Sequence, residues 1–244
     1  MPIMKGSLYG VGVGPGAPDL MTLRAVNTIK KADILCLPQP AKEQCRAYSI
    51  ALQAVPEAGG KDCLCCDFSM TRDRKRLAEA HQGIYLSVRD NLLAGKNIAF
   101  LTIGDPSVYS TFSYISERAS GDGFRVELVS GIPSFCASAA ELGLPLCLGD
   151  EEVHIGTGQS DIAALLRLPG TKVIMKAGRR LQEIKTLLME REREGSIKVY
   201  AAADCGLPEE KFFYSAADIP EDSGYMLVLI VKEQEIYQKS KKSP

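Results

Sequence analysis

The sequence predicts an α/β protein of two domains, the first with a mainly parallel sheet and the second with a mixed sheet. Short β-rich runs alternate with helical periods along the first half, an order typical of parallel strands covered by helices. Towards the C-terminus, three strand-like runs follow one another without a helix between them, which favours antiparallel pairing. At roughly 150 residues per domain, 244 residues accommodate two small domains. We place the boundary near residues 120–123, giving domains over residues 1–120 and 121–244.

In the first half, each predicted strand is a short apolar run that ends at a turn signal. A loop of glycines and prolines follows the first run, and residues 22–31 then carry Leu23, Val26 and Ile29 at helical spacing. Longer helical periods predict helices over residues 72–93 and 110–119. The strands of this half are expected at residues 7–13, 34–37, 97–102 and 125–129.

The second half begins with a predicted helix over residues 133–142, which leads to a glycine-rich stretch around Gly156 and Gly158. A further helix is expected over residues 181–194. The strands of this half are expected at residues 171–175, 198–203, 211–215 and 225–231. Because the last three of these have no helices between them, we expect the antiparallel strands of the protein here.

The composition argues against two classes of protein. The chain carries 29 Lys+Arg against 30 Asp+Glu, for a net charge of −1, whereas proteins that bind nucleic acid through phosphate contacts usually have a basic excess. No stretch reaches the ~20 apolar residues that span a membrane. The first residues contain no apolar segment of a secretory signal. We therefore expect a cytoplasmic protein that binds neither nucleic acid nor membrane.

The 8 cysteines are expected to be reduced thiols, because nothing marks the chain as secreted. Cys63, Cys65 and Cys66 form the one cluster, which invites a metal or redox interpretation. A zinc site usually needs a second pair of ligands at matching spacing, and the sequence offers only His81 and His154, with no second CxxC. We predict no metal site.

A glycine-rich loop follows the first predicted strand, over residues 10–18. Gly12, Gly14 and Ala17 satisfy a loose dinucleotide-binding fingerprint. Pro15 and Pro18, however, each remove a backbone N–H that a pyrophosphate would need. The second strand also ends without the acid that would bind a ribose. The loop is therefore either a tight turn or a place where bare backbone approaches a ligand other than a dinucleotide.

A second motif, over residues 101–110, follows a predicted parallel strand. Gly104 allows close approach of the backbone, and Asp105 projects an acid at the carboxyl edge of the sheet, where open α/β folds bind ligands. The alternative is that Asp105 and Pro106 only form a turn before a helix capped by Ser110.

Taken together, these segments resemble the tetrapyrrole (corrin/porphyrin) methyltransferase family. The segments that match, in order, are residues 12–16, 104–106, 130–134, 174–177 and 201–206. Within the family, residues 8–16, 102–113 and 131–137 look like the branch that methylates C20 of precorrin-2 or cobalt-factor II. Ile103 stands where the uroporphyrinogen methylases carry a second glycine, which favours the C20 branch.

The resemblance implies a homodimer of two-domain subunits, with S-adenosylmethionine bound in the cleft between the domains and S-adenosylhomocysteine as the product. It also implies a place in cobalamin biosynthesis. The residues expected to bind the cofactor are Pro15, Ile103, Gly104, Asp105, Val108, Pro133, Ser134, Met175 and Gly206.

The resemblance further implies which residues serve the reaction. Asp105 would bind and orient the cationic cofactor, while the proton of the tetrapyrrole meso carbon would leave to Asp105, Tyr109 or solvent. The substrate carries carboxylates around its rim, and basic side chains after a strand can pair with them. The residues expected to bind the substrate are Gly14, Lys176, Arg179 and Arg180. For the basic ones, the alternative is a solvated charge run at the start of a helix.

Three other functions remain open at this stage. The first is another ring methyltransferase of the same pathway. The second is an NAD(P)-dependent oxidoreductase, which the missing ribose-binding acid disfavours. The third is a non-catalytic tetrapyrrole carrier with His81 and His154 as axial metal ligands, for which Asp105 would have no use. The abundance of cysteine favours the cobalt-containing substrate, and His154 is the better candidate axial ligand, with an ordinary structural histidine as its alternative.

Overall fold

The computed structural model describes residues 5–68 and 73–234. The chain divides into two compact units, Met1–Pro133 and Ser134–Pro244. The sequence placed this division too early, after residue 120. The reason for the difference is that the strand over residues 125–129 pairs with the strand over residues 7–12, so it belongs to the first unit.

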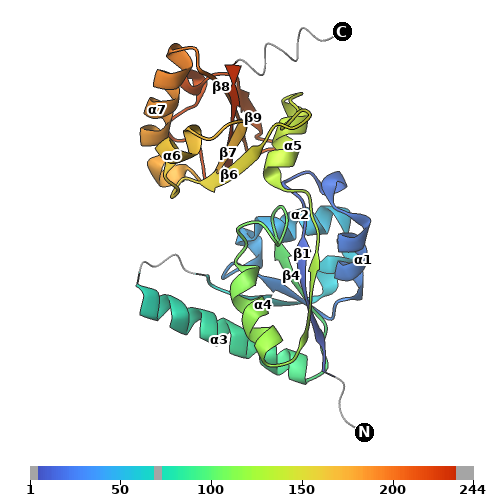
Figure 1. Ribbon diagram of the computed structural model, residues 1–244. Helices are drawn as coiled ribbons and strands as arrows, with labels where there is room; N and C mark the ends of the chain where they lie inside the picture. Colours follow the sequence, from blue (N-terminus) through green and yellow to red (C-terminus); the bar gives the residue numbers. More distant parts are fainter. Residues whose placement is uncertain (1–4, 69–72, 235–244) are drawn as a thin grey trace. The chain divides into compact units, whose positions relative to one another are not determined.

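The first unit is a five-stranded parallel sheet covered by helices on both faces (Figure 1). The strands lie in the order β3-β2-β4-β1-β5, and each neighbouring pair is parallel. Their bounds are β1 Ser7–Gly12, β2 Ile34–Leu37, β3 Asp62–Cys65, β4 Ile98–Thr102 and β5 Arg125–Val129. The predicted mainly parallel sheet is therefore confirmed.

In the part of this unit that the structure describes, four α-helices cover the sheet: α1 Leu23–Lys31, α2 Arg46–Ala54, α3 Arg74–Leu93 and α4 Phe112–Gly121. The inner strand β2 is apolar throughout because both of its faces are covered by helices. Leu35 and Leu37 pack in one core with α1 and α2, while Ile34 and Cys36 pack in a second core with α3 and α4. Both faces are thus buried, as is usual for parallel sheets.

The helix starts follow from local capping. The Thr22 side chain accepts a hydrogen bond from the Ala25 amide and begins α1, and the Asp73 carboxylate accepts those of Lys75 and Arg76 at the start of α3. These bonds satisfy amides that have no partner within the helix. The predicted helix over residues 72–93 is confirmed from Arg74 onward, whereas residue 72 lies outside the described residues.

The second unit is a mixed sheet in the order β6-β7-β10-β8-β9. Its strands are β6 Val153–Thr157, β7 Thr171–Met175, β8 Ile197–Ala203, β9 Lys211–Phe213 and β10 Leu227–Glu233. Its α-helices are α5 Ser134–Glu141, α6 Ile162–Leu166 and α7 Leu181–Arg193. Strands β6 and β7 are parallel, and the other neighbouring pairs are antiparallel, which confirms the mixed sheet.

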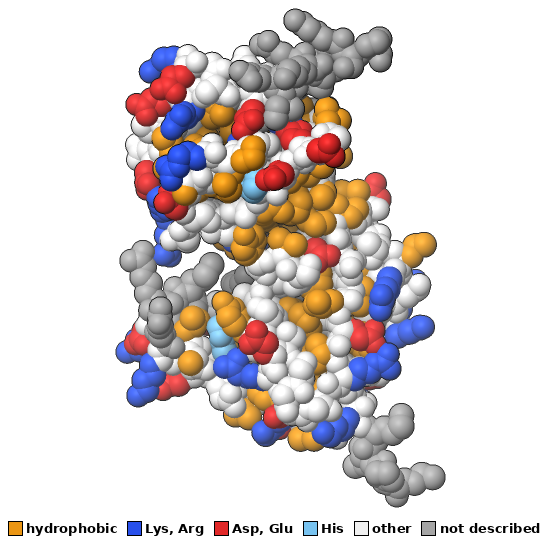
Figure 2. All heavy atoms as spheres, in the orientation of Figure 1, with side chains coloured by type: hydrophobic (Ala, Val, Ile, Leu, Met, Phe, Trp, Pro, Cys, Tyr) orange, Lys and Arg blue, Asp and Glu red, His pale blue; other side chains and the backbone are white. Residues whose placement is uncertain are grey.

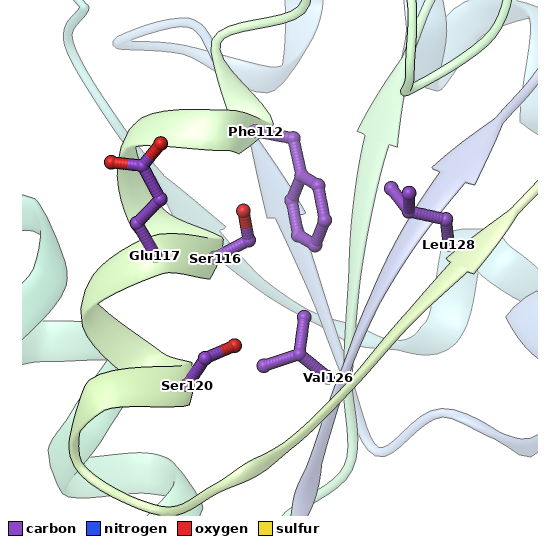
Figure 3. Close-up of a pocket in the computed structure, with 6 residues that line it drawn as sticks. All are labelled: Phe112, Ser116, Glu117, Ser120, Val126 and Leu128. Carbon is purple, nitrogen blue, oxygen red and sulfur yellow. The ribbon is translucent and has the colours of Figure 1, made fainter.

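Among the described residues, no helix is both long enough and apolar enough to cross a membrane. On the face drawn in Figure 2, basic and acidic side chains of the described residues are interspersed, consistent with the net charge of −1. A groove of about 550 Å³ lies between α4 and the edge strand β5 (Figure 3). Its lining residues, Phe112, Ser116, Glu117, Ser120, Val126 and Leu128, include none of the predicted site residues.

Candidate ligand-binding site at the strand ends

Three glycines bring three loops of the first unit together at the carboxyl edge of its sheet. Gly12 ends β1, Gly104 follows β4, and Gly131 follows β5. A Cβ atom at Gly12 would lie 2.5 Å from the Gly104 carbonyl oxygen, and one at Gly131 only 2.1 Å from it. The Gly104 amide also donates to the Gly14 carbonyl at 2.8 Å, and both residues have positive φ, 74° and 77°. Only glycine fits this packing.

The carboxylate of Asp105 joins two of these loops. Oδ2 accepts the Gly131 amide at 3.0 Å, and Oδ1 accepts the Ser107 amide at 2.8 Å and its hydroxyl at 2.5 Å. Asp105 is half-buried. The sequence missed both partners. Ser107 carried a readable signal, since an Asp side chain often accepts the amide two residues on, but Gly131 is too distant in the chain for any local pattern.

The other residues predicted in this unit lie on the same loops. Ile103 and Val108 are half-buried, and Pro15 is buried. Tyr109 is 47% exposed and has a φ of 48°, a left-handed conformation that is uncommon for a bulky residue. Such conformations cluster at functional sites. The first-unit edge thus combines close backbone, one carboxylate and an exposed phenol.

In the second unit, most of the predicted residues lie at or shortly after the ends of β7 and β8, at one edge of the mixed sheet: Met175, Lys176, Arg179, Arg180 and Gly206. Met175 ends β7 and pairs with Val228, while Ala203 ends β8 and pairs with Leu227. The loops after β7 and β8 therefore leave the sheet on either side of β10, at the same edge. Met175 is half-buried.

Two of these loop residues again have left-handed backbone conformations: Lys176 with φ 53° after β7, and Asp204 with φ 49° after β8. Gly206 also has a positive φ, 80°, and its amide donates to Glu210 Oε2 at 2.9 Å. Pro133 and Ser134 lie at the junction of the two units, at the start of α5, and are half-buried.

The three basic residues predicted to bind substrate differ in their contacts. Arg180 donates to the Gly158 and Ser160 carbonyls and pairs with Glu183. The Lys176 ammonium lies 5.8 Å from the centre of the Tyr225 ring. Arg179, by contrast, is exposed.

The cysteines and histidines are the side chains that the sequence analysis considered as metal ligands. Within residues 5–68 and 73–234, no three His, Cys, Asp or Glu side chains come together in a way that could hold a metal ion. Cys36 and Cys66 are buried, with their sulfur atoms 3.5 Å apart. His81 stacks on Tyr114, with ring centres 4.4 Å apart. His154, on β6, places Nε2 3.0 Å from the Glu152 carboxylate.

These features define an α/β protein of two units, in which glycine-rich loops gather where parallel strands end, the edge at which open α/β folds bind ligands. The family model described as Tetrapyrrole (Corrin/Porphyrin) Methylases matches residues 7–219. The chain therefore belongs to the tetrapyrrole methylase family.

The proteins similar to the chain include two named relatives and one solved structure. A probable cobalt-precorrin-2 C(20)-methyltransferase of Methanocaldococcus jannaschii is 36% identical, over 76% of this chain and 78% of the relative. A cobalt-precorrin-2 C(20)-methyltransferase of Salmonella typhimurium is 32% identical, over 77% and 79%. A uroporphyrin-III C-methyl transferase of Thermus thermophilus, complexed with S-adenyl homocysteine, has a TM-score of 0.67 at 21% identity, over 95% of this chain and 100% of that one. This last likeness shows the shared fold.

Proposed function

We propose that the protein is an S-adenosylmethionine-dependent methyltransferase that places one methyl group on C20 of cobalt-factor II or precorrin-2 in cobalamin biosynthesis. The likeness to two C20-methyltransferases over three quarters of the chain carries this proposal. The glycine-lined edge with Asp105 supports it, because this edge suits a small ligand held through backbone groups and one carboxylate. A cytoplasmic location agrees with such a biosynthetic role.

The residues of the first-unit edge fit S-adenosylmethionine, which supplies, when bound, an electrophilic methyl group on a positively charged sulfur. The Asp105 carboxylate provides a half-buried negative charge, and Ile103 and Val108 provide apolar contact. The bare backbone at Gly104 permits close approach. The proposed contacts are Pro15, Ile103, Gly104, Asp105, Val108, Pro133, Ser134, Met175 and Gly206.

The protein's own part in the reaction is mainly orientation. Asp105 fixes two loops through its three hydrogen bonds, so the groups that hold the methyl donor keep their positions. Orientation of two reactants and exclusion of water contribute about 7–11 kcal/mol to catalysis. The proton of the meso carbon leaves to Asp105, to Tyr109 or to solvent. A Tyr109→Phe variant tests the phenol, because kcat falls in this variant only if the phenol accepts the proton.

We further propose that Gly14, Lys176 and Arg179 contact the tetrapyrrole, with the two basic side chains pairing with its rim carboxylates. Exposed Arg179 is the guanidinium suited to bidentate pairing. We also propose that the protein is a homodimer, which sedimentation at micromolar concentration tests. A monomer would remove the dimer from the proposal and leave the chemistry in place.

The deciding experiment compares cobalt-factor II with metal-free precorrin-2 as substrates, with product mass and the methylated carbon as readouts. We expect a single methyl group on C20 and faster turnover of the cobalt form. A methyl group on another carbon would indicate a different ring methyltransferase of the family. Binding of NAD(P) with no binding of S-adenosylmethionine would overturn the proposed activity.

The same assay tests His154 as an axial ligand of cobalt. Its ring already lies 3.0 Å from Glu152, which favours a structural role. We therefore expect His154→Ala to leave the ratio of the two turnover rates unchanged. A selective loss of the cobalt reaction would instead assign His154 to the metal.

A further inference from the structure

The side chain of Arg180 connects two loops that leave the second sheet at neighbouring strands. It lies at the start of α7, after β7. Its Nη1 atom donates to the carbonyl oxygens of Gly158 at 2.9 Å and Ser160 at 3.2 Å, both in the loop after β6. Its Nε and Nη2 atoms donate to the two carboxylate oxygens of Glu183 at 2.8 and 2.5 Å. We call these contacts the Arg180 bridge.

The two loops joined by this bridge are packed backbone against backbone. The Gly158 amide donates to the Met175 carbonyl at 2.8 Å. A Cβ atom at Gly158 would lie 2.7 Å from the Ala177 Cα atom and 2.9 Å from the Lys176 carbonyl oxygen. Lys176 itself has a φ of 53°, a conformation that surrounding contacts must maintain. The backbone geometry at the end of β7 thus depends on close contact with the loop after β6.

Electrostatics make Arg180 a poor partner for a further carboxylate. Its guanidinium is already paired in a two-point contact with Glu183, so the pair is neutral overall. Another carboxylate would have to displace Glu183 or the two carbonyls. The hydrogen bonds that Arg180 donates to Glu183 also raise the pKa of Arg180 and lower the pKa of Glu183, so both groups are charged at neutral pH.

We propose that Arg180 is a positioning residue: the Arg180 bridge holds the loop after β6 against the loop after β7 in the arrangement that binds S-adenosylmethionine, and Arg180 does not bind a substrate carboxylate. This inference rests on the proposed function, which assigns Met175 to the contacts with S-adenosylmethionine. It departs from the sequence prediction, which grouped Arg180 with Lys176 and Arg179 as substrate ligands.

Calorimetry with S-adenosylhomocysteine, in the absence of tetrapyrrole, separates the two roles. Arg180→Ala and Arg180→Lys both lose the bridge, because one ammonium cannot span two carbonyls and a two-point carboxylate contact. We expect both variants to raise the Kd by about tenfold or more, where tenfold corresponds to about 1.4 kcal/mol. Arg193→Ala, which removes an exposed cation from the other end of α7, should leave the Kd unchanged.

A substrate ligand would behave differently. In that case S-adenosylhomocysteine would bind Arg180→Ala as it binds the parent protein, only the KM for the tetrapyrrole would rise, and Arg180→Lys would recover part of the loss. This pattern would overturn the inference. We expect that pattern for Arg179→Ala, with an increased tetrapyrrole KM and an unchanged Kd.

Hydrogen exchange gives a readout that needs no ligand. In Arg180→Ala and in the milder Glu183→Gln, the amides of residues 157–160 should exchange faster while those of β10 keep their protection. Unchanged exchange in this loop would refute the bridge, whatever the ligand. If the parent protein fails to bind S-adenosylhomocysteine, the proposed function fails, and hydrogen exchange still decides whether the bridge positions the loops.

Discussion

Asp105 and Gly131 are joined by a hydrogen bond across two loops, with the Gly131 amide donating to Oδ2 of Asp105 at 3.0 Å. The bond connects the segment after β4 with the segment after β5. These strands are not neighbours, because β1 lies between them. A single carboxylate therefore fixes the spacing of loops on either side of the central glycine-rich turn.

We expect Asp105→Ala to weaken binding of S-adenosylmethionine, because hydrogen bonds to a charged group contribute about 1.5–3 kcal/mol each. Asp105→Asn should be milder, since its amide oxygen still accepts from Ser107 while the bond with Gly131 is lost. Calorimetry and thermal denaturation of both variants test this. Binding equal to that of the parent protein in both variants would reduce Asp105 to a turn residue.

The glycine packing predicts a sharp contrast between two substitutions. In Gly131→Ala, the new Cβ atom meets the Gly104 carbonyl oxygen at 2.1 Å, and such overpacking costs about 1–3 kcal/mol or more. In Gly121→Ala, the new atom meets nothing within 4 Å, and alanine in a helix gains up to about 1 kcal/mol over glycine. Urea denaturation should show the first variant destabilised and the second equal to the parent protein or more stable. Equal stability of both variants would contradict the packing described above.

The Glu192 carboxylate predicts loss of stability in acid. It accepts the amides of Val199 and Ala216 at 3.0 and 2.9 Å and the Ser215 hydroxyl at 2.8 Å, and it lies 3.5 Å from the Lys198 ammonium. Burial acts to raise its pKa, but these partners outweigh burial and lower the pKa from 4.5. Because the pKa of Glu192 is lower in the folded state, its carboxylate contributes fully to stability at pH values above 4.5. This contribution is lost as the pH falls through the folded-state pKa.

The test compares thermal denaturation of the parent protein and Glu192→Gln at neutral pH and in acidic buffer below pH 4.5. Loss of a charged hydrogen-bond acceptor should cost about 1–3 kcal/mol at neutral pH. The difference between the two proteins should shrink in the acidic buffer. If the difference in stability between the two proteins stayed constant with pH, the charge of Glu192 would make no contribution, and the loss would come from side-chain shape alone.

Thiol labelling should follow burial. Cys65 and Cys147 are exposed, whereas Cys36 and Cys45 are buried. The hydrogen bond to Cys66, together with burial, raises the pKa of Cys36, and burial raises that of Cys45, so both have little reactive thiolate. With N-ethylmaleimide and mass spectrometry of the native protein, we expect Cys65 and Cys147 to be labelled first. Early labelling of Cys36 would show that β2 opens readily.

The sequence predicted best those elements whose pattern is local. The apolar run of β2 and the order of strands and helices defined the parallel sheet, and the absence of helices before β10 indicated the antiparallel pairs. Among the described residues, two α-helices and two strands were missed: α2, α6, β3 and β6. Strand β6 contains Gly156 and was read as a glycine-rich stretch. Helix α2 begins at Arg46, and its N-cap residue Cys45 makes no side-chain capping bond.

The candidate site shows the same limit. Asp105 and Gly104 could be selected from one strand end, because an acid and a glycine after a parallel strand suit ligand binding. The partner of Asp105 could not be predicted in this way, because Gly131 comes close to Asp105 only when β1 pairs with both β4 and β5. Likewise, Arg180 reads as an exposed cation in the sequence, and its contact with Gly158 arises from the pairing of β6 with β7.

The order of the second sheet also bears on how the chain acquires its structure during synthesis. Among the described residues, β10 is the last strand in sequence order, yet it lies in the middle of the sheet, between β7 and β8. Until the ribosome has released residues 227–233, β7 and β8 lack their shared neighbour and expose strand edges that invite aggregation. The first unit has all its strands within residues 7–129 and can fold earlier. The sheet of the second unit is therefore completed later during synthesis than the sheet of the first unit.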